Sequence, residues 1–298
     1  MLLREFMRIY WEHCATFKSP QTTRKEKSIY KIWLKTPLGE MQVAEITAKD
    51  ITEALALAVK QHKSPRTIDY IINVVLNIFK YAIKISLVEL CPELKRPKIR
   101  NARIRIYTPE ELKKVLNIAA IVGDIYVVIM FALHTGLRLG EIAALKHRDL
   151  NLEEKTISVT GSEKSSPRTI PLNQPLFEAL LTYNYSGRPE SFLIPCYTKT
   201  NKKDLVSLRR DTWSQTYHRM IESLGFNLGL TSNKDKLTFH SLRHTYASWL
   251  AKNEVPLWTI SKFLGHKNIA STQRYAHLSL SHLREITSTV EPEFIKCT

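Results

Sequence analysis

One short segment of the sequence gathers basic side chains on a single predicted helix face. Within residues 238–250, His240, Arg243 and His244 are three or four positions apart and therefore neighbours on a helix. A guanidinium donates paired hydrogen bonds to oxyanions, and a neighbouring imidazole can move a proton. In a chain of 298 residues with 10 His and 18 Arg, chance alone gives about 0.6 H-x-x-R pairs. The pair therefore needs support from the rest of the chain.

Two further blocks supply this support. The first is T-G-x-R-x-x-E at 135–141, which carries Arg138, and the second is L-G-H, in which His266 precedes Tyr275 by nine residues. Together with H-x-L-R-H at 240–244, the three blocks stand in an order that resembles the tyrosine recombinases, or phage integrase family. The motifs extend over about half of the chain, and the resemblance is looser outside them.

The resemblance implies a fold class and an activity. The fold would be mainly α, with an N-terminal helical, SAM-like core-binding domain and a mostly helical catalytic domain that contains a small β-hairpin. The enzyme would cut and rejoin double-stranded DNA through a 3′-phosphotyrosyl intermediate, with no cofactor and no metal. Four identical protomers would assemble on paired recombination sites and exchange strands through a Holliday junction, with accessory DNA-bending or directionality proteins as further partners.

The resemblance also assigns roles that these side chains can perform. Arg138 and Arg243 would bind the non-bridging oxygens of the scissile phosphate, and His266 would add a third donor. Each preorganised donor of this kind is typically worth about 10²- to 10³-fold in rate. Glu141, one helical turn from Arg138, would orient that guanidinium. Three donors are thus a reasonable basis for catalysis without a metal ion.

The remaining roles concern protons. Tyr275 would be the nucleophile, and because a phenol titrates near pH 10, its proton must leave during attack. By resemblance the acceptor is His240, and a lysine on the β-hairpin protonates the leaving 5′-oxygen. The best candidate is Lys164, although family spacing falls on Glu163, so the loop must be one residue shorter.

Two other interpretations of these residues remain open. Tyr275 is also compatible with an ordinary core position. His240 and His244 have a spacing that can hold zinc, but position 241 is not glutamate and Arg243 would repel a cation. The sequence therefore favours catalysis over a metal site.

Composition independently indicates a polyanionic partner. The chain has 44 Lys+Arg and 28 Asp+Glu, a net charge of +16, and residues 1–107 contribute 20 − 10 = +10 of it.

The four cysteines are far apart and suggest neither a zinc site nor a disulfide framework. The longest apolar run, 125–133, is too short to cross a bilayer, and the N-terminus lacks a signal-peptide core. We expect a cytoplasmic protein with no membrane partner.

The first domain is predicted to span residues 1–92. Thr47 and Asp50 precede an apolar series, and Ser64 followed by Pro65 predicts a helix start. Apolar residues then recur at helical spacing from Ile68 to Ala82. This pattern is typical of a small helical domain.

A basic linker is predicted for residues 93–107. It contains Pro97 and is expected to follow a DNA backbone without reading bases, with a plain solvated loop as the alternative. The candidate DNA-binding residues are Lys95, Arg96, Lys98, Arg100, Arg103 and Arg105.

The catalytic domain with its C-terminal tail is predicted to span residues 108–298. Thr108-Pro109-Glu110-Glu111 is a capping box with proline at the first helical position. A buried helix is expected at 124–134, with Gly136 at its end, and further helices at 174–183 and 255–264. Residues 156–161 and 168–172 alternate with period two and predict a hairpin. The apolar residues of the tail would dock on a neighbouring protomer or pack on their own domain.

Four functions are compatible with these observations. With about 100 residues before the catalytic part, the favoured one is a compact site-specific integrase of a prophage or genomic island. Xer-type resolution of chromosome or plasmid dimers is close behind. A type IB topoisomerase-like relaxase would use the same residues without pairing two sites, and a non-catalytic DNA-binding regulator would have lost the chemistry.

Overall fold

The computed structural model describes residues 1–98, 105–162, 165–182, 187–196, 205–232 and 234–279. The chain divides into two compact units, Met1–Asn101 and Ala102–Thr298. Among the described residues, no helix is long and apolar enough to cross a membrane.

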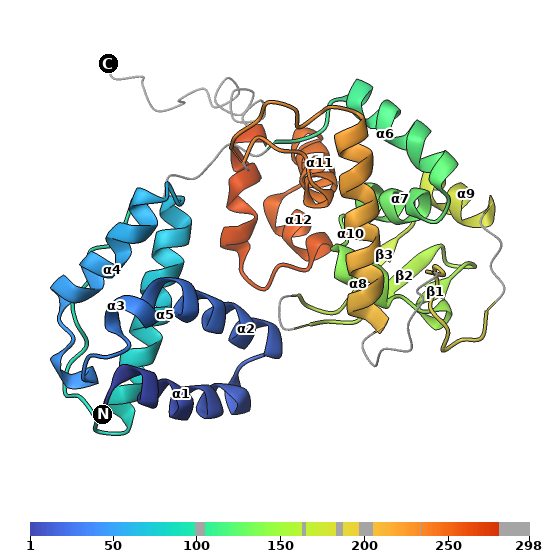
Figure 1. The fold of residues 1–298 in the computed structure, drawn as a ribbon. Helices are drawn as coiled ribbons and strands as arrows, with labels where there is room; N and C mark the ends of the chain where they lie inside the picture. Colours follow the sequence, from blue (N-terminus) through green and yellow to red (C-terminus); the bar gives the residue numbers. More distant parts are fainter. Residues whose placement is uncertain (99–104, 163–164, 183–186, 197–204, 233, 280–298) are drawn as a thin grey trace, which may run out of the picture. The chain divides into compact units, whose positions relative to one another are not determined.

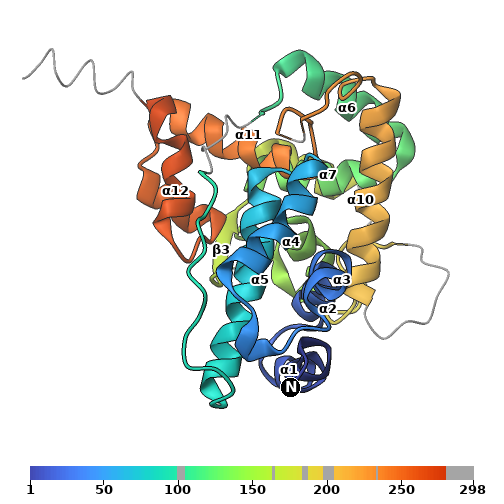
Figure 2. The same cartoon turned by 60° about the vertical axis from the view of Figure 1, so that its left-hand side comes forward.

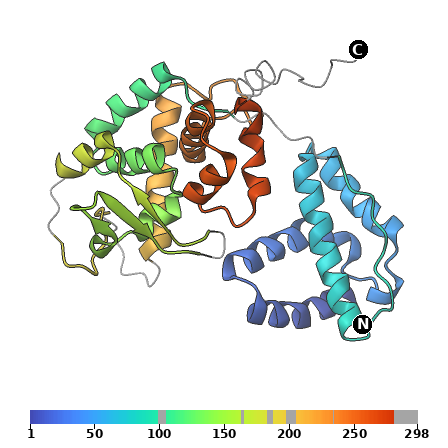
Figure 3. The same cartoon turned by 180° about the vertical axis from the view of Figure 1, so that it is seen from behind.

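The first unit consists of helices around one apolar core. Its elements are α1 (Leu3–Phe17), α2 (Pro20–Ile29), η1 (Tyr30–Leu34), α3 (Lys35–Leu38), η2 (Val43–Glu45), α4 (Ala48–Lys60) and α5 (Pro65–Lys84). The predicted helix starts are confirmed, because Thr47 and Asp50 form a capping box and Ser64 Oγ accepts from the Thr67 N–H. Helix α5 packs against α2 and α4 (Figure 3) through a buried face that includes Ile71, Ile78 and other apolar residues.

The second unit is helical around a small sheet. Its helices are α6 (Pro109–Val122), α7 (Ile125–Thr135), α8 (Leu139–Ala144), η3 (His147–Asp149), α9 (Gln174–Thr182), α10 (Leu205–Ser223), α11 (Phe239–Lys252), α12 (Leu257–Leu264), η4 (Ile269–Ser271) and η5 (Gln273–Ser279). Helix α7 is the central element, buried along nearly all of its length and packed against α6, α9 and α11. The long helix α10 packs against α6, α8 and α11 and is seen from two sides in Figure 1 and Figure 2.

The sheet has three antiparallel strands in the order β1 (Leu150–Asn151), β2 (Thr156–Val159) and β3 (Arg168–Pro171). Ile157 pairs with both Leu150 and Ile170, and Val159 pairs with Arg168. The predicted hairpin is confirmed, but its strands end at 159 and 171. Strand β1 was not predicted, because two residues are too few to show an alternating pattern.

Candidate active site

The first sequence block ends α7 with a glycine in the left-handed region. Gly136 has φ 65°, and its N–H donates to Ala132 O. A Cβ here would lie 2.6 Å from Tyr246 Cδ1 and 2.7 Å from Leu264 Cδ2. Only glycine combines this dihedral with this close approach. The turn therefore presses the first block against side chains of α11 and α12, which carry the other two blocks.

Arg138 follows this turn and caps helix α8. Its backbone N–H donates to Glu141 Oε2 at 2.9 Å, and its Nη1 lies 3.4 Å from Glu141 Oε1. The Arg138 side chain is 29% exposed, whereas that of Glu141 is 7% exposed. One buried carboxylate thus fixes both the backbone and the guanidinium of Arg138, while part of that guanidinium stays accessible.

Arg243, on α11, ties the first and third blocks together. Its Nη1 donates to Gly136 O at 2.6 Å and its Nη2 to Leu264 O at 2.8 Å. Nη1 also lies 4.0 Å from Glu141 Oε2. A guanidinium has five N–H donors, and these two carbonyl bonds use two of them. Arg243 is therefore held rigidly and retains donors for a ligand.

The third block positions His266 and Tyr275. Helix α12 ends at Gly265, with φ 66°, and the next residue, His266, places its Nδ1 2.7 Å from Thr272 Oγ1. Thr272 O in turn accepts from the N–H of Tyr275. Tyr275, in η5, is buried, with 2% of the residue exposed. Thr272 thus links the imidazole to the short helix that carries the phenol.

Side chains from all three blocks line one polar pocket. The predicted residues Arg138, His240, Arg243, His266 and Tyr275 all contribute to it. The two arginines face the same space and share the same carboxylate, as a two-pronged phosphate grip requires. The pocket is also lined by three residues that were not assigned to it from the sequence, namely His244, Ser271 and Arg274.

Burial keeps the histidines of the pocket neutral, and neighbouring positive charges add to the effect. Desolvation, followed by the charges of Arg243 and Arg138, lowers the pKa of His240 and of His266 to about 4 each. Desolvation, with His240 as the next cause, lowers the pKa of His244 to about 3. At pH 7 all three imidazoles can therefore accept a proton.

The phenol of Tyr275 contacts His244. Oη lies 2.5 Å from His244 Nδ1, and the His244 ring stacks edge-on against His240 with centroids 4.6 Å apart. Burial raises the pKa of Tyr275 to about 12 although Arg243 and Arg274 oppose the shift. The family resemblance pointed to His240 as the proton acceptor, whereas in this structure the imidazole in contact with the phenol is His244. The sequence signal that could have pointed to His244 was its position one helical turn after His240.

The other predicted site residues have different outcomes. Lys164 lies outside the described residues, as do Arg100 and Arg103 of the linker. Within the described part of the linker, Arg96 pairs with Asp69 and Arg105 with Glu111. These two arginines make contacts inside their own units, which the interpretation of the linker as a purely phosphate-binding strap did not include. Among the described residues, no group of three or more His, Cys, Asp or Glu side chains could hold a metal ion.

Comparison with known proteins agrees with this geometry. Residues 105–282 match the phage integrase family, and residues 2–56 match the N-terminal SAM-like domain of phage integrases. The tyrosine recombinase XerA of Pyrococcus horikoshii is 28% identical over 80% of this chain and 79% of its own length.

Solved structures show the same fold. The Tn1549 transposon integrase in complex with transposon right end DNA has a TM-score of 0.75 at 18% identity, covering 97% of this chain and 99% of that one. A lambda integrase tetramer bound to a Holliday junction has a TM-score of 0.69 at 20% identity, covering 90% and 78%. With 178 of its 298 residues matched to the family, the chain belongs to the phage integrase family of tyrosine recombinases, enzymes that cleave and rejoin DNA.

Proposed function

We propose that this chain is a site-specific DNA recombinase in which Tyr275 attacks a backbone phosphate. A bond forms between Tyr275 Oη and phosphorus, the bond to the 5′-oxygen breaks, and a 3′-phosphotyrosyl link remains for rejoining. The observation that carries this proposal is the single pocket shared by Arg138, Arg243, His266 and Tyr275. Its two guanidiniums and one imidazole can stabilise charge on the non-bridging oxygens.

Two imidazoles are available for the proton of Tyr275. Resemblance assigns His240, and the 2.5 Å contact favours His244 as the first acceptor, with His240 beside it. The leaving 5′-oxygen takes a proton from Lys164, which resemblance assigns to this step. Glu141 orients the guanidinium of Arg138.

A covalent adduct tests this chemistry. Duplexes with a nick close to the cleavage position would trap the protein on DNA as an SDS-resistant adduct, which we expect to vanish in Tyr275→Phe. Tyr246→Phe is the matched control, because Tyr246 lies on α11 beside Gly136 but does not line the pocket. No adduct on any nicked site from the wild-type protein would favour a non-catalytic DNA-binding regulator.

The biological setting is a second level of the proposal. A compact integrase of a prophage or genomic island is the first candidate. Dimer resolution is the second candidate, and the observation that favours it is the similarity to XerA over 80% of this chain. Plasmids with two sites taken from the flanks of the gene would separate them: integration between molecules supports the first, and resolution within one molecule supports the second. Relaxation of any supercoiled plasmid without sequence preference would instead indicate a relaxase.

Assembly and DNA binding follow from the same proposal. Double-stranded DNA would be bound by both units, and four protomers would pair two sites, as in the lambda integrase tetramer on a Holliday junction. The linker residues Lys95 and Lys98 and their basic neighbours would neutralise backbone phosphates, so affinity should fall steeply with salt. DNA-bending or directionality proteins would assist the choice of direction.

A further inference from the structure

A buried ion pair lies next to the pocket, between Glu141 of α8 and Arg168 at the start of β3. Both side chains are 7% exposed, and neither of them lines the pocket itself. Arg168 Nη1 lies 3.3 Å from Glu141 Oε1, and Nη2 lies 3.1 Å from Oε2. A two-pronged pair of this geometry fixes orientation as well as charge. Arg168 therefore covers both oxygens of the carboxylate that the two pocket arginines also approach.

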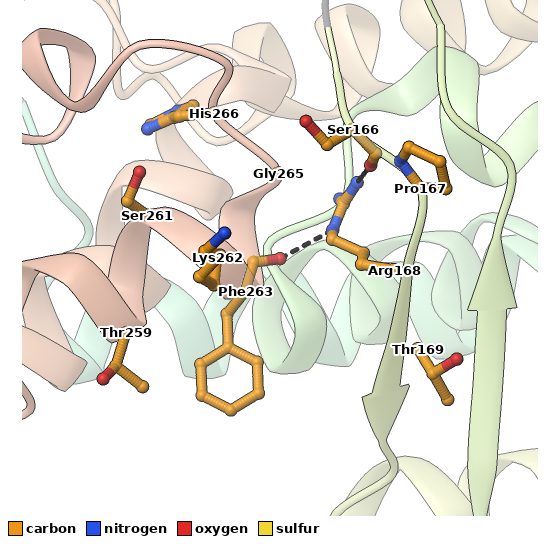
Figure 4. A pocket seen from close by; sticks show the side chains of 10 residues that line it. All are labelled: Ser166, Pro167, Arg168, Thr169, Thr259, Ser261, Lys262, Phe263, Gly265 and His266. Atoms are coloured by element: carbon orange, nitrogen blue, oxygen red, sulfur yellow. Dashed lines mark hydrogen bonds between the residues drawn. The ribbon is translucent and has the colours of Figure 1, made fainter.

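Arg168 is held in this position by the protein around it. Its Nε donates to Phe263 O at 2.7 Å, and its Nη1 donates to Ser166 O at 3.3 Å (Figure 4). A Cβ on Gly265 would lie 2.4 Å from Arg168 Nη1, so the turn after α12 packs directly against the guanidinium. Figure 4 shows the side chain reaching from the strand toward this turn. The guanidinium is thus anchored independently of the pocket arginines.

The two pocket arginines make longer contacts with the same carboxylate. Arg138 Nη1 lies 3.4 Å from Glu141 Oε1, and Arg243 Nη1 lies 4.0 Å from Oε2. An N–H···O hydrogen bond is usually about 2.7–3.2 Å long. Burial raises the pKa of Glu141, but the hydrogen bond and charge of Arg168 are the largest of the opposing effects, which lower that pKa to about 2. Arg168 is therefore the main partner of the carboxylate, and the pocket arginines keep N–H donors for a ligand.

The pocket arginines differ in how firmly they are held. The Arg243 side chain is 3% exposed and donates to two backbone carbonyls. The Arg138 side chain is 29% exposed, and within the described part of the chain its guanidinium donates one hydrogen bond, to Glu141. A buried carboxylate that loses its partner is strongly unfavourable. Without Arg168, Glu141 would therefore draw the Arg138 guanidinium into a two-pronged pair and occupy its N–H groups.

We propose that Arg168 is a positioning residue that keeps Glu141 from closing on Arg138, so that the Arg138 guanidinium stays available to the scissile phosphate. Glu141 can then orient Arg138 through its long contact without neutralising it. This inference rests on the proposed function, in which Arg138 binds that phosphate. Loss of one preorganised donor to a developing oxyanion costs about 10²- to 10³-fold in rate. Arg168 should therefore matter for the reaction although it does not line the pocket.

A pair of substitutions tests the direction of this effect. Single-turnover formation of the SDS-resistant adduct on a nicked duplex is measured for wild type, Arg168→Gln, Glu141→Gln and the double variant. We expect Arg168→Gln to react about 10²-fold more slowly than wild type. The double variant should react about 10-fold faster than Arg168→Gln, because no carboxylate is left to draw Arg138 away from the phosphate.

A supporting role for Arg168 predicts a different order of rates. If Arg168 only braced the strand against Phe263, or only held Glu141 in place, removing the carboxylate as well would leave the rate unchanged or lower it further. A double variant that is no faster than Arg168→Gln would therefore overturn the proposal.

Arg209→Gln is the matched control, because Arg209 is another buried arginine and donates to Ala143 O and Ile194 O. Adding Glu141→Gln to it should not speed adduct formation. A comparable acceleration there would overturn the proposal, since loss of the carboxylate would then help a variant unrelated to Arg138. Adducts that persist in Tyr275→Phe would overturn the proposed function and this inference with it, whereas the order of the rates overturns the inference alone.

Arg168→Lys covers the case in which Arg168→Gln does not fold. Lysine retains the charge but cannot form the two-pronged pair, so a smaller defect is expected. Glu141→Gln in that background should recover part of the lost rate. Absence of this recovery, or loss of the wild-type thermal transition in both Arg168 variants, would overturn the proposal.

Discussion

Replacing Glu141 by glutamine removes the one carboxylate that three guanidiniums share. Glu141 lies 3.1 Å from Arg168, 3.4 Å from Arg138 and 4.0 Å from Arg243. Burial alone would raise the pKa of Glu141, but hydrogen bonds and the charge of Arg168 outweigh it and lower the pKa to about 2. Glutamine keeps the shape and removes the charge, so the variant isolates the electrostatic contribution.

The magnitude follows from that pKa. Lowering it from the ordinary 4.5 to about 2 corresponds to about 3 kcal/mol of stability at pH 7. Because the side chain is 7% exposed, solvent screens this contribution little. The same range, 3–5 kcal/mol, is typical of breaking a buried pair by removing one partner. We therefore expect Glu141→Gln to lower the free energy of unfolding by about 3 kcal/mol.

The pH dependence has a definite sign. A carboxylate with a lowered folded-state pKa contributes fully above pH 4.5, and its contribution falls as the pH drops toward 2. Glutamine does not titrate, so the gap between wild type and variant should shrink by about 2 kcal/mol between pH 7 and pH 3. A gap of the same size at both pH values would refute this reasoning, because the contribution would then not come from charge.

The assay has to report on the second unit alone. Trp11 and Trp33 lie in the first unit, so replacing both with Phe leaves fluorescence from the three tryptophans of the second unit. Urea unfolding is then followed in this background at each pH. Glu190→Gln is the matched control, because Glu190 is 64% exposed and pairs with Lys146 and Arg148. It should change stability by less than about 1 kcal/mol.

Two further predictions concern the pocket, and a third concerns the turn at Gly265. His244→Phe removes the partner of the phenol and should slow adduct formation on nicked duplexes about 10²-fold; a rate equal to that of wild type would exclude His244 from proton transfer, and His240→Phe gives the comparison. In NMR titrations of the DNA-free protein, the ring signals of His240, His244 and His266 should not move between pH 6 and 8; a midpoint near 6.5 would contradict the lowered pKa values. Gly265 has φ 66°, and in Gly265→Ala the new Cβ would collide with Arg168, so the variant should be less stable by about 1–3 kcal/mol in urea unfolding. An unchanged unfolding midpoint would contradict this close contact.

The sequence was sufficient where chemistry is local. The capping box at Thr108 and the start of α5 at Pro65 follow from short-range hydrogen bonds, and both are present. The buried helix expected at 124–134 is α7, shifted by one residue. The three motif blocks also identified five of the eight residues that line the pocket, because their types and order are specific.

The sequence was insufficient where partners come from distant segments. Arg168 is 27 residues from Glu141 and 95 from Phe263 along the chain. A periodic pattern of apolar residues predicts helices and strands, but it does not predict contacts between such distant residues. The contact between His244 and Tyr275 likewise depends on how α11 and η5 pack. The four-residue spacing from 240 to 244 showed that His244 shares a helix face with His240, but only the tertiary fold decides which imidazole meets the phenol.

The pocket also sets a condition on when the reaction can begin. In the DNA-free protein the pKa of Tyr275 is about 12 and that of His244 about 3, so at neutral pH the phenol keeps its proton and the imidazole is a weak base. Desolvation is the first cause of the low pKa of His244, and the guanidiniums of Arg274 and Arg243 add to it. In the proposed reaction, a phosphodiester bound by Arg138 and Arg243 would bring a negative charge that offsets those guanidiniums and would raise the pKa of the imidazole. Attack also loads charge onto the phosphate oxygens, which strengthens that effect. Under the proposed mechanism, His244 is therefore a weak base until the scissile phosphate is in place, and the phenol of Tyr275 stays protonated in the absence of DNA.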